Sequence, residues 1–243
     1  MIQILKTIIT TLWFWFVLTL ITTIYFPFII TALLRGEKTS LAFGPIWWKT
    51  VLKASGVKIQ EHNKENYQKG KSYIFISNHA SWTDIIIAFA NFPQSFNYLS
   101  KEALFKVPIF GWSIKRCGYI SIRREDAHNA ANAFKQVIEK TKKGHSVLFY
   151  PEGSRSRDGV VTRFKKGAFL AAKYADVEIL PIIVKGSNYL MPKGTGIYRP
   201  CKIDIYYQKP FKVTDLSSEE LLRKMDIIRA EMNTILFKNN VKT

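Results

Sequence analysis

An uncharged stretch from Thr7 to Leu34 lies near the start of this 243-residue chain, between Lys6 and Arg35. As one helix, these 28 residues would extend about 42 Å, whereas the hydrocarbon core of a bilayer is about 30 Å thick. The stretch is too long for the core of a signal peptide, and no small-residue cleavage site follows it. We therefore predict a membrane anchor, with a buried core helix as the alternative.

Two further features bear on how this segment lies in the membrane. Pro27 is expected to kink or end the helix, because proline lacks the backbone N–H. The aromatic and basic composition of residues 43–49 is typical of a membrane–water boundary. One lysine precedes the stretch and several basic residues closely follow it, so the positive-inside rule places everything after residue 35 on the cytoplasmic face of the cell (inner) membrane. Whether the segment spans the bilayer or lies in it stays open.

The charge of the chain predicts an anionic partner. Lys and Arg number 36 against 18 Asp and Glu, which gives a net charge of +18. A lipid surface, a nucleic acid or a phosphorylated small molecule would fit this charge. A hydrophobic content of 47% excludes a disordered basic tail. Cys117 and Cys201 lie far apart in no metal-ligand spacing, so we expect neither a disulfide framework nor a bound metal.

Apolar runs alternate with helical stretches in the rest of the chain. The pattern predicts strands over 73–77, 96–100, 119–122, 146–150, 179–184 and 202–208, and helices over 82–90, 127–142, 167–174 and 219–237. Such alternation indicates an α/β fold. We predict a single layered domain over residues 56–243, with a central mixed sheet flanked by helices, preceded by a membrane-anchoring helical segment over residues 1–55.

Candidate catalytic groups follow the first predicted strand. His79 and Asp84 are five residues apart where this strand meets a helix. If His79 lies in the turn, the carboxylate of Asp84 can accept from one ring N–H and leave the other nitrogen as a proton acceptor. The alternative is that Asp84 only caps the helix, since Ser81 to Asp84 resembles a capping box.

Candidate phosphate-binding groups stand at the ends of other predicted strands. Arg123 ends one strand, and Lys101 follows another. A guanidinium at such a position binds a phosphate with paired N–H donors, although a solvated surface arginine is the alternative. A Pro- and Gly-containing turn after the strand ending at residue 150 places Glu152 and Arg155 close together, which a charged surface turn would also explain.

Four blocks in this order resemble the four motifs of the glycerolipid acyltransferase family. The blocks lie around His79, over Gly118–Arg123, over Tyr150–Ser156 and over Leu180–Gly186. The resemblance spans about residues 72–187, and the lysophosphatidate (1-acyl-sn-glycerol-3-phosphate) acyltransferases are most similar. The third motif of the family usually has Phe and Thr where this chain has Tyr150 and Ser154.

The resemblance implies an acyltransferase of phospholipid biosynthesis that acts on lysophosphatidate at a membrane. His79 would be the general base and Asp84 would orient it, while Lys101, Arg123 and Arg155 would hold the acceptor phosphate. Glu152, Gly153 and Ser154 would shape that pocket. The acyl donor would be acyl-CoA or an acidic acyl carrier protein, and no cofactor or metal is expected because a thioester is already activated.

Three alternatives to this activity remain at this point, and one of them is a non-catalytic membrane-surface scaffold that keeps the motif pattern. Glycerol 3-phosphate or another lysophospholipid is an alternative acceptor within the family. A nucleic-acid-binding protein would explain the net charge, but the sequence has no zinc finger, RNP motif or recognisable basic helix, so we expect no nucleic-acid partner.

Overall fold

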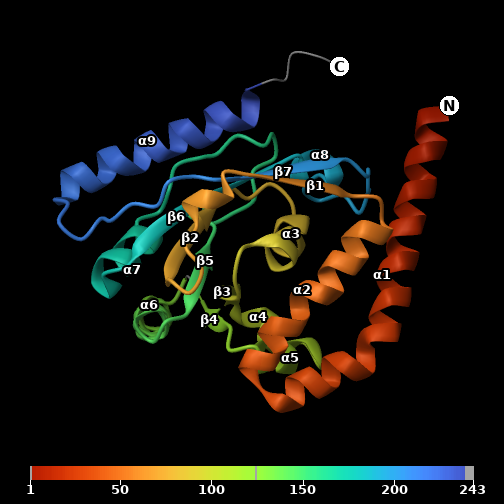
Figure 1. The fold of residues 1–243 in the computed structure, drawn as a ribbon, viewed down its shortest axis with the longest axis horizontal. Coiled ribbons are helices and arrows are strands. Elements are labelled where there is room, and N and C mark those ends of the chain that lie inside the picture. Colours follow the sequence, from red (N-terminus) through yellow and green to blue (C-terminus); the bar gives the residue numbers. More distant parts are fainter. Residues whose placement is uncertain (1, 124, 239–243) are drawn as a thin grey trace.

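The computed structural model describes residues 2–123 and 125–238, which form a seven-stranded sheet with helices on both faces (Figure 1). The strands are β1 Lys58–His62, β2 Tyr73–Ser77, β3 Phe96–Lys101, β4 Ile120–Ile122, β5 Ser146–Phe149, β6 Glu178–Lys185 and β7 Lys202–Tyr207. Their order is β1-β7-β6-β2-β5-β3-β4. β6 and β7 pair antiparallel and every other neighbouring pair is parallel. The predicted mixed sheet is confirmed.

The helices divide between the two faces of this sheet. They are α1 Ile2–Arg35, α2 Glu37–Ala54, α3 Thr83–Asn91, α4 Glu102–Phe105, α5 Phe110–Arg116, α6 Ala127–Lys142, α7 Gly167–Ala175, α8 Ser187–Leu190 and α9 Ser218–Phe237, with a 3₁₀ turn over Lys64–Asn66. Core residues of α1, α2, α3 and α8 pack on one face, and those of α6, α7 and α9 pack on the other (Figure 1). The result is a three-layered α/β domain.

The central strand β2 explains why the sheet is covered on both sides. Tyr73 and Phe75 belong to the core under α1 to α3, whereas Ile74 and Ile76 belong to the core under α6, α7 and α9. Successive side chains of a strand point to opposite faces, so an uninterrupted apolar strand requires a helical layer on each side. All of these side chains are fully buried.

The first two helices form a pair joined at Gly36. The backbone there has φ 107° and ψ −174°, a conformation that glycine adopts without strain. Pro27 lies inside α1 and does not end it, because the helix continues to Arg35. Figure 1 shows α1 changing direction in its last part. The aromatic segment 43–49, predicted as a membrane boundary, lies within α2.

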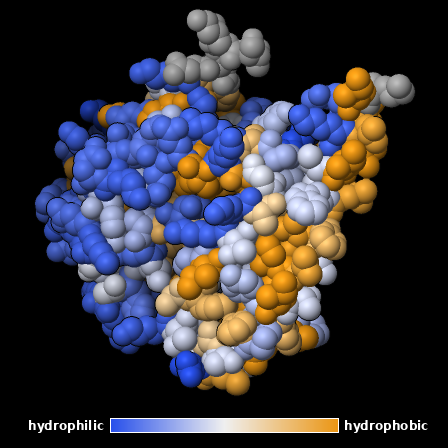
Figure 2. All heavy atoms as spheres, turned by 45° about the vertical axis from the view of Figure 1, so that its right-hand side comes forward, coloured by the Kyte–Doolittle hydropathy of each residue, from blue (hydrophilic) through white to orange (hydrophobic). Residues whose placement is uncertain are grey.

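One face of α1 is part of the domain core. Phe14, Val17 and Ile21 are buried in the same cluster as β2 and α3. Most other large apolar side chains of α1 are exposed, and Figure 2 shows a largely orange surface along this side of the molecule. By length and composition α1 is the one helix among the described residues that can cross a membrane. The division into an anchor over 1–55 and a domain over 56–243 stays a prediction; its boundary falls in the turn between α2 and β1.

Replacement of Phe14 by alanine tests whether α1 is structurally part of the domain. The Phe14 ring is 1% exposed and stacks on Tyr198 at a centroid distance of 4.1 Å. We expect Phe14→Ala to lower the free energy of unfolding by about 3–5 kcal/mol, measured by chemical denaturation in detergent micelles. Phe16 in the same helix is 56% exposed. The matched Phe16→Ala control should change stability by no more than about 0.5 kcal/mol, and equal losses would contradict the packing.

Candidate active site

Four parallel strands bring the predicted site residues to one edge of the sheet. β2, β5, β3 and β4 are adjacent and parallel, so their carboxyl ends lie together. His79 follows β2, Arg155 follows β5, Lys101 ends β3 and Arg123 follows β4. The carboxyl edge of a parallel sheet is where α/β proteins usually bind ligands.

The predicted contact between His79 and Asp84 is present. His79 Nδ1 lies 2.8 Å from Asp84 Oδ2. Because an ionised carboxylate only accepts hydrogen bonds, this contact places the proton of a neutral imidazole on Nδ1 and leaves Nε2 as the acceptor. The His79 side chain is 12% exposed, whereas that of Asp84 is fully buried. The ring of His79 therefore presents a basic nitrogen at an accessible surface.

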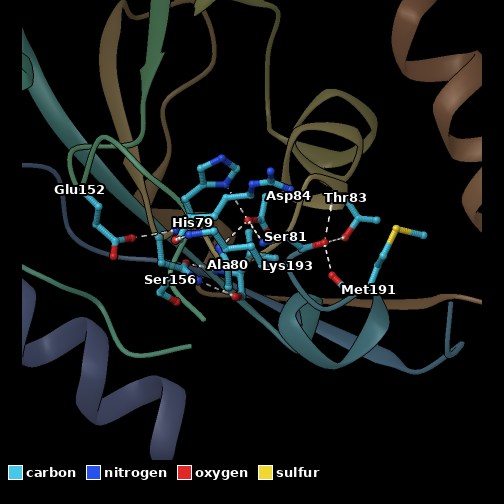
Figure 3. A network of polar contacts seen from close by, with 12 residues as sticks. His79, Ala80, Ser81, Thr83, Asp84, Glu152, Ser156, Met191 and Lys193 are labelled. Carbon is cyan, nitrogen blue, oxygen red and sulfur yellow. Dashed lines mark hydrogen bonds and ion pairs between the residues drawn. The ribbon is translucent and has the colours of Figure 1, made fainter. Parts of the chain in front are cut away.

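Asp84 also performs the structural role that the sequence left as an alternative. Oδ2 accepts from the backbone N–H groups of Ala80 and Ser81, each at 2.8 Å (Figure 3). The carboxylate lies in the first turn of α3, where the helix dipole favours negative charge. These bonds fold the loop back so that residue 79 meets residue 84. Loop closure and histidine orientation are thus two effects of one carboxylate oxygen.

The loop after β5 fixes the backbone of His79 from the other side. Glu152 Oε1 accepts from the His79 N–H at 2.9 Å, and the Ser156 N–H donates to the His79 carbonyl at 2.7 Å (Figure 3). The Tyr150 ring stacks on the imidazole with centroids 4.0 Å apart. The first and third sequence motifs therefore form one rigid unit around His79.

Both oxygens of Glu152 are occupied by the protein itself. Oε2 accepts from the Thr162 N–H at 2.9 Å and from its hydroxyl at 3.1 Å. Burial raises the pKa of Glu152 above its usual value, although the hydrogen bonds from Thr162 and His79 oppose the shift. The carboxylate of Glu152 thus holds the histidine loop in place, and its predicted part in shaping the phosphate pocket stays a prediction.

The rest of this loop contains Arg155 and is bonded to Lys193. Gly153 and Ser154 form the turn that leads to Arg155, and the Arg155 carbonyl accepts from Lys193 Nζ at 2.5 Å. Ser154 is exposed and Arg155 half-buried. Lys193 comes from the segment after α8. Lys193 was not among the predicted site residues, because no local motif surrounds it.

Arg123 is farther from His79 than Arg155 is. Three strand spacings of about 4.8 Å separate β4 from β2, which puts their ends about 14 Å apart. Arg123 Nε and Nη2 donate to the two oxygens of Glu102 at 2.9 and 3.0 Å, and Nη1 lies 3.3 Å from Asp126. Lys101 is exposed beside Glu102. A phosphate bound by Arg123 would therefore compete with Glu102.

Two other residues that were not predicted position the histidine loop. The Asn78 side chain donates to the Val184 carbonyl at 2.9 Å and accepts from the Val184 N–H at 2.8 Å. Ser81 Oγ donates to the Met191 carbonyl at 2.7 Å. These contacts tie the loop to β6 and to the segment after α8. Both partners are backbone atoms, so no side-chain pattern in the sequence could have revealed them.

Within residues 2–123 and 125–238, no cluster of three or more His, Cys, Asp or Glu side chains has the arrangement of a metal site. The site that the structure assembles consists of a histidine, a buried carboxylate and nearby cations. This set can remove a proton from an alcohol and hold a bound anion near it.

Comparison with known proteins identifies a shared domain and fold. Residues 58–185 match a family model described as Acyltransferase. Curated relatives include the chloroplast 1-acyl-sn-glycerol-3-phosphate acyltransferase of Brassica napus, 35% identical over 63% of this chain and 45% of that protein. The protein of the same name from Streptococcus pneumoniae is 34% identical over 64% of this chain and 56% of its own length. The chain thus spans about half the length of these relatives.

A solved structure covers the whole fold. The crystal structure of the 1-acyl-sn-glycerophosphate acyltransferase PlsC from Thermotoga maritima superposes with a TM-score of 0.83 and 26% sequence identity. The match covers 98% of this chain and 99% of that one. The similarity therefore includes α1 and α2 as well as the α/β domain.

Proposed function

This chain belongs to the acyltransferase family, and on that premise we propose that it transfers a fatty acyl group from acyl-CoA or acyl carrier protein to the free sn-2 hydroxyl of lysophosphatidate. The product is phosphatidate, a precursor of membrane phospholipids. The observation that carries the proposal is the 2.8 Å contact between His79 Nδ1 and Asp84 Oδ2, which leaves a basic nitrogen at the carboxyl edge of the sheet.

The proton follows a short route in this scheme. His79 Nε2 accepts the proton of the lysophosphatidate hydroxyl, and the oxygen attacks the thioester carbonyl. The negative charge of Asp84 stabilises the imidazolium that forms. When the tetrahedral intermediate collapses, the carbon–sulfur bond breaks and the imidazolium protonates the departing thiolate. The products are phosphatidate and a free thiol, and His79 is neutral again.

Cations around the site support an anionic acceptor. Arg155 lies one strand from His79, and Lys193 is bonded to the same loop. We assign the acceptor phosphate to these two residues first, with Arg123 and Lys101 as an outer pair. The net charge of +18 also attracts the phosphates of CoA or an acidic carrier protein.

The apolar surface of α1 supports a site at the bilayer. Lysophosphatidate stays in the membrane, because removing each CH₂ from the hydrocarbon costs about 0.8 kcal/mol. An enzyme held at the interface by α1 avoids that extraction. The excess of basic residues after the apolar stretch supports a location of the α/β domain on the cytoplasmic face of the membrane.

A product assay tests the proposal directly. Purified protein in detergent receives acyl-CoA or acyl carrier protein with one acceptor from a panel of lysophosphatidate, glycerol 3-phosphate and other lysophospholipids. We expect thiol release and phosphatidate formation in equal amounts with lysophosphatidate. Preference for a different acceptor would reassign the substrate, and thiol release without any acylated product would overturn acyl transfer.

The two arginines should contribute unequally to phosphate binding. We expect Arg155→Ala to raise the KM for lysophosphatidate by about 10–100-fold, since hydrogen bonds between charged groups contribute about 1.5–3 kcal/mol. Arg123→Ala should have a smaller effect, because Arg123 is exposed and already paired with Glu102. Monoacylglycerol, which has no phosphate, is the control acceptor for steady-state kinetics. The assignment is wrong if Arg155→Ala raises the KM for monoacylglycerol as much as the KM for lysophosphatidate. It is also wrong if Arg123→Ala has the larger effect on the KM for lysophosphatidate.

A further inference from the structure

The segment that joins β3 to β4 exposes an unusual number of large apolar side chains. We call residues 102–116, which contain α4 and α5, the apolar hairpin. Its exposed large apolar residues are Leu104, Val107, Ile109, Phe110 and Trp112. Exposed apolar side chains that are scattered singly need no explanation, but five within nine residues of one short segment indicate a contact surface.

Ile109 has an unfavourable conformation as well as an unfavourable environment. Its φ is 62° and its ψ is −56°, the strained conformation of a γ-turn with positive φ, which β-branched residues rarely adopt, and the residue is 67% exposed. The turn is tight, since a Cβ on Gly111 would lie 2.1 Å from the Phe105 carbonyl oxygen. Backbone strain of this kind is concentrated at functional positions. The strained turn holds the apolar side chain of Ile109 in water.

The apolar hairpin is attached to the end of α1. Arg116 donates from Nε to the Leu33 carbonyl at 2.9 Å and from Nη2 to the Leu34 carbonyl at 2.8 Å. These are carbonyls of the last helical turn, where a cation is favourable. Figure 2 shows the apolar surface of α1 reaching the lower end of the molecule, where Figure 1 places α5. The hairpin therefore extends the surface of α1.

Charge complementarity points to the kind of partner. The apolar hairpin and the residue before it carry four basic side chains, at Lys101, Lys106, Lys115 and Arg116, against one acidic side chain, Glu102. All four basic residues are exposed. Apolar and aromatic side chains surrounded by lysine and arginine are typical of segments that insert into the surface of an anionic bilayer.

We propose that the apolar hairpin is a second membrane contact, which inserts its apolar tip among anionic phospholipids beside α1. A second contact at one end of α1 would fix the rotation of the protein about the axis of this helix. The hairpin begins at Lys101 and Glu102, at the carboxyl end of β3, so its insertion turns the carboxyl edge of the sheet toward the lipid. This orientation of the active site rests on the proposed function, whereas the lipid contact does not.

Fluorescent labelling tests the contact directly in the whole 243-residue chain. Burial raises the pKa of the Cys117 and Cys201 thiols to about 11, so an introduced exposed cysteine reacts selectively at about pH 7. We expect an NBD group at Ile109→Cys to shift to the blue on vesicles that contain phosphatidylglycerol, and to be quenched by brominated lipid. Ile227 on α9, on the opposite face of the sheet, is 51% exposed and gives the matched control, Ile227→Cys.

Several outcomes of the labelling would overturn the proposal. Co-sedimentation first verifies that the labelled protein is bound to the vesicles. A bound protein with no blue shift at residue 109, or with equal shifts at residues 109 and 227, has no lipid contact at the hairpin. If the blue shift at residue 109 is as large on vesicles of phosphatidylcholine alone, the hairpin does not bind anionic lipid specifically.

The double variant Ile109→Asn/Phe110→Ser tests the consequence for activity. Asparagine lacks the branch at Cβ that crowds isoleucine at a positive φ, so the fold and its unfolding midpoint should be retained. We expect acyl transfer to lysophosphatidate in anionic vesicles to fall about tenfold, because one of two linked contacts is lost, with unchanged activity in detergent micelles. If the double variant keeps its activity in anionic vesicles as well as in micelles, the apolar hairpin does not orient the active site. Absence of activity in the wild-type protein would contradict the proposed function instead, and the labelling result would remain interpretable.

Discussion

His79→Ala is expected to lower the kcat for acyl transfer by about 10²–10⁴-fold, which is the usual contribution of a general base. The change removes the Nε2 atom that accepts the hydroxyl proton, but it leaves the backbone bonds of residue 79 to Glu152 and Ser156. The KM for lysophosphatidate should change little, because the phosphate is bound by other residues. Thiol release and phosphatidate formation, measured at saturating acceptor, give the kcat.

The chain contains a matched control for this variant. His62 forms a second histidine–carboxylate pair, with Nε2 2.7 Å from Asp204 Oδ1, on the neighbouring strands β1 and β7. His62→Ala removes an imidazole of the same chemistry away from the carboxyl ends of β2 and β5, and we expect an unchanged kcat. Near wild-type turnover of His79→Ala would refute its role as general base.

Asp84→Asn is expected to lower the kcat by about 10²–10⁴-fold with little loss of stability. The amide oxygen can still accept from the N–H groups of Ala80 and Ser81, so the loop stays closed. The negative charge that stabilises the imidazolium is lost, and the corresponding change in a serine protease triad costs about 10⁴-fold. Steady-state kinetics measure the kcat, and the midpoint of chemical denaturation measures the stability.

Asp84→Ala separates the two roles of this carboxylate. It leaves two backbone N–H groups without their acceptor, and each unsatisfied buried donor costs about 1–3 kcal/mol. We therefore expect Asp84→Ala to lose both stability and activity, whereas Asp84→Asn loses activity alone. Asp204→Asn, at the partner of His62, is the matched control and should retain activity. If Asp84→Asn keeps its kcat, Asp84 only closes the loop.

Local sequence patterns predicted most of the sheet and its covering helices. The prediction of a strand over 73–77 matches β2, and that of a helix over 127–142 matches α6. The uncharged stretch from Thr7 to Leu34 likewise lies within one helix, although Pro27 does not end it. These elements are long or strongly apolar, so their own residues determine their conformation.

The missed elements are those whose conformation depends on neighbours. β1 is a polar edge strand, Lys58 to His62, and only its pairing with β7 makes it a strand. α2 contains Pro45 within an aromatic segment that we interpreted only as a membrane boundary. α4, α5 and α8 have four to seven residues each, too few for a periodic pattern.

The candidate site shows the same division between local and tertiary information. The residue types were visible in the sequence, and so was the position of His79, Arg123 and Arg155 after strands. The sequence did not show that Glu152 binds the backbone of His79, nor that Arg123 is paired with Glu102. Contacts between residues 20 or more positions apart depend on the order of strands in the sheet, which local periodicity does not encode.

The sequence alone determined that this protein has an apolar N-terminal helix, an α/β domain and the ordered motifs of an acyltransferase, because each depends on residues close together in the chain. The tertiary structure alone decided which groups meet. It folded Asp84 onto both His79 and the loop backbone, placed Arg155 nearer the histidine than Arg123, and joined the apolar hairpin to α1. These arrangements follow from the parallel strand order and from hydrogen bonds to backbone atoms, which any residue type offers.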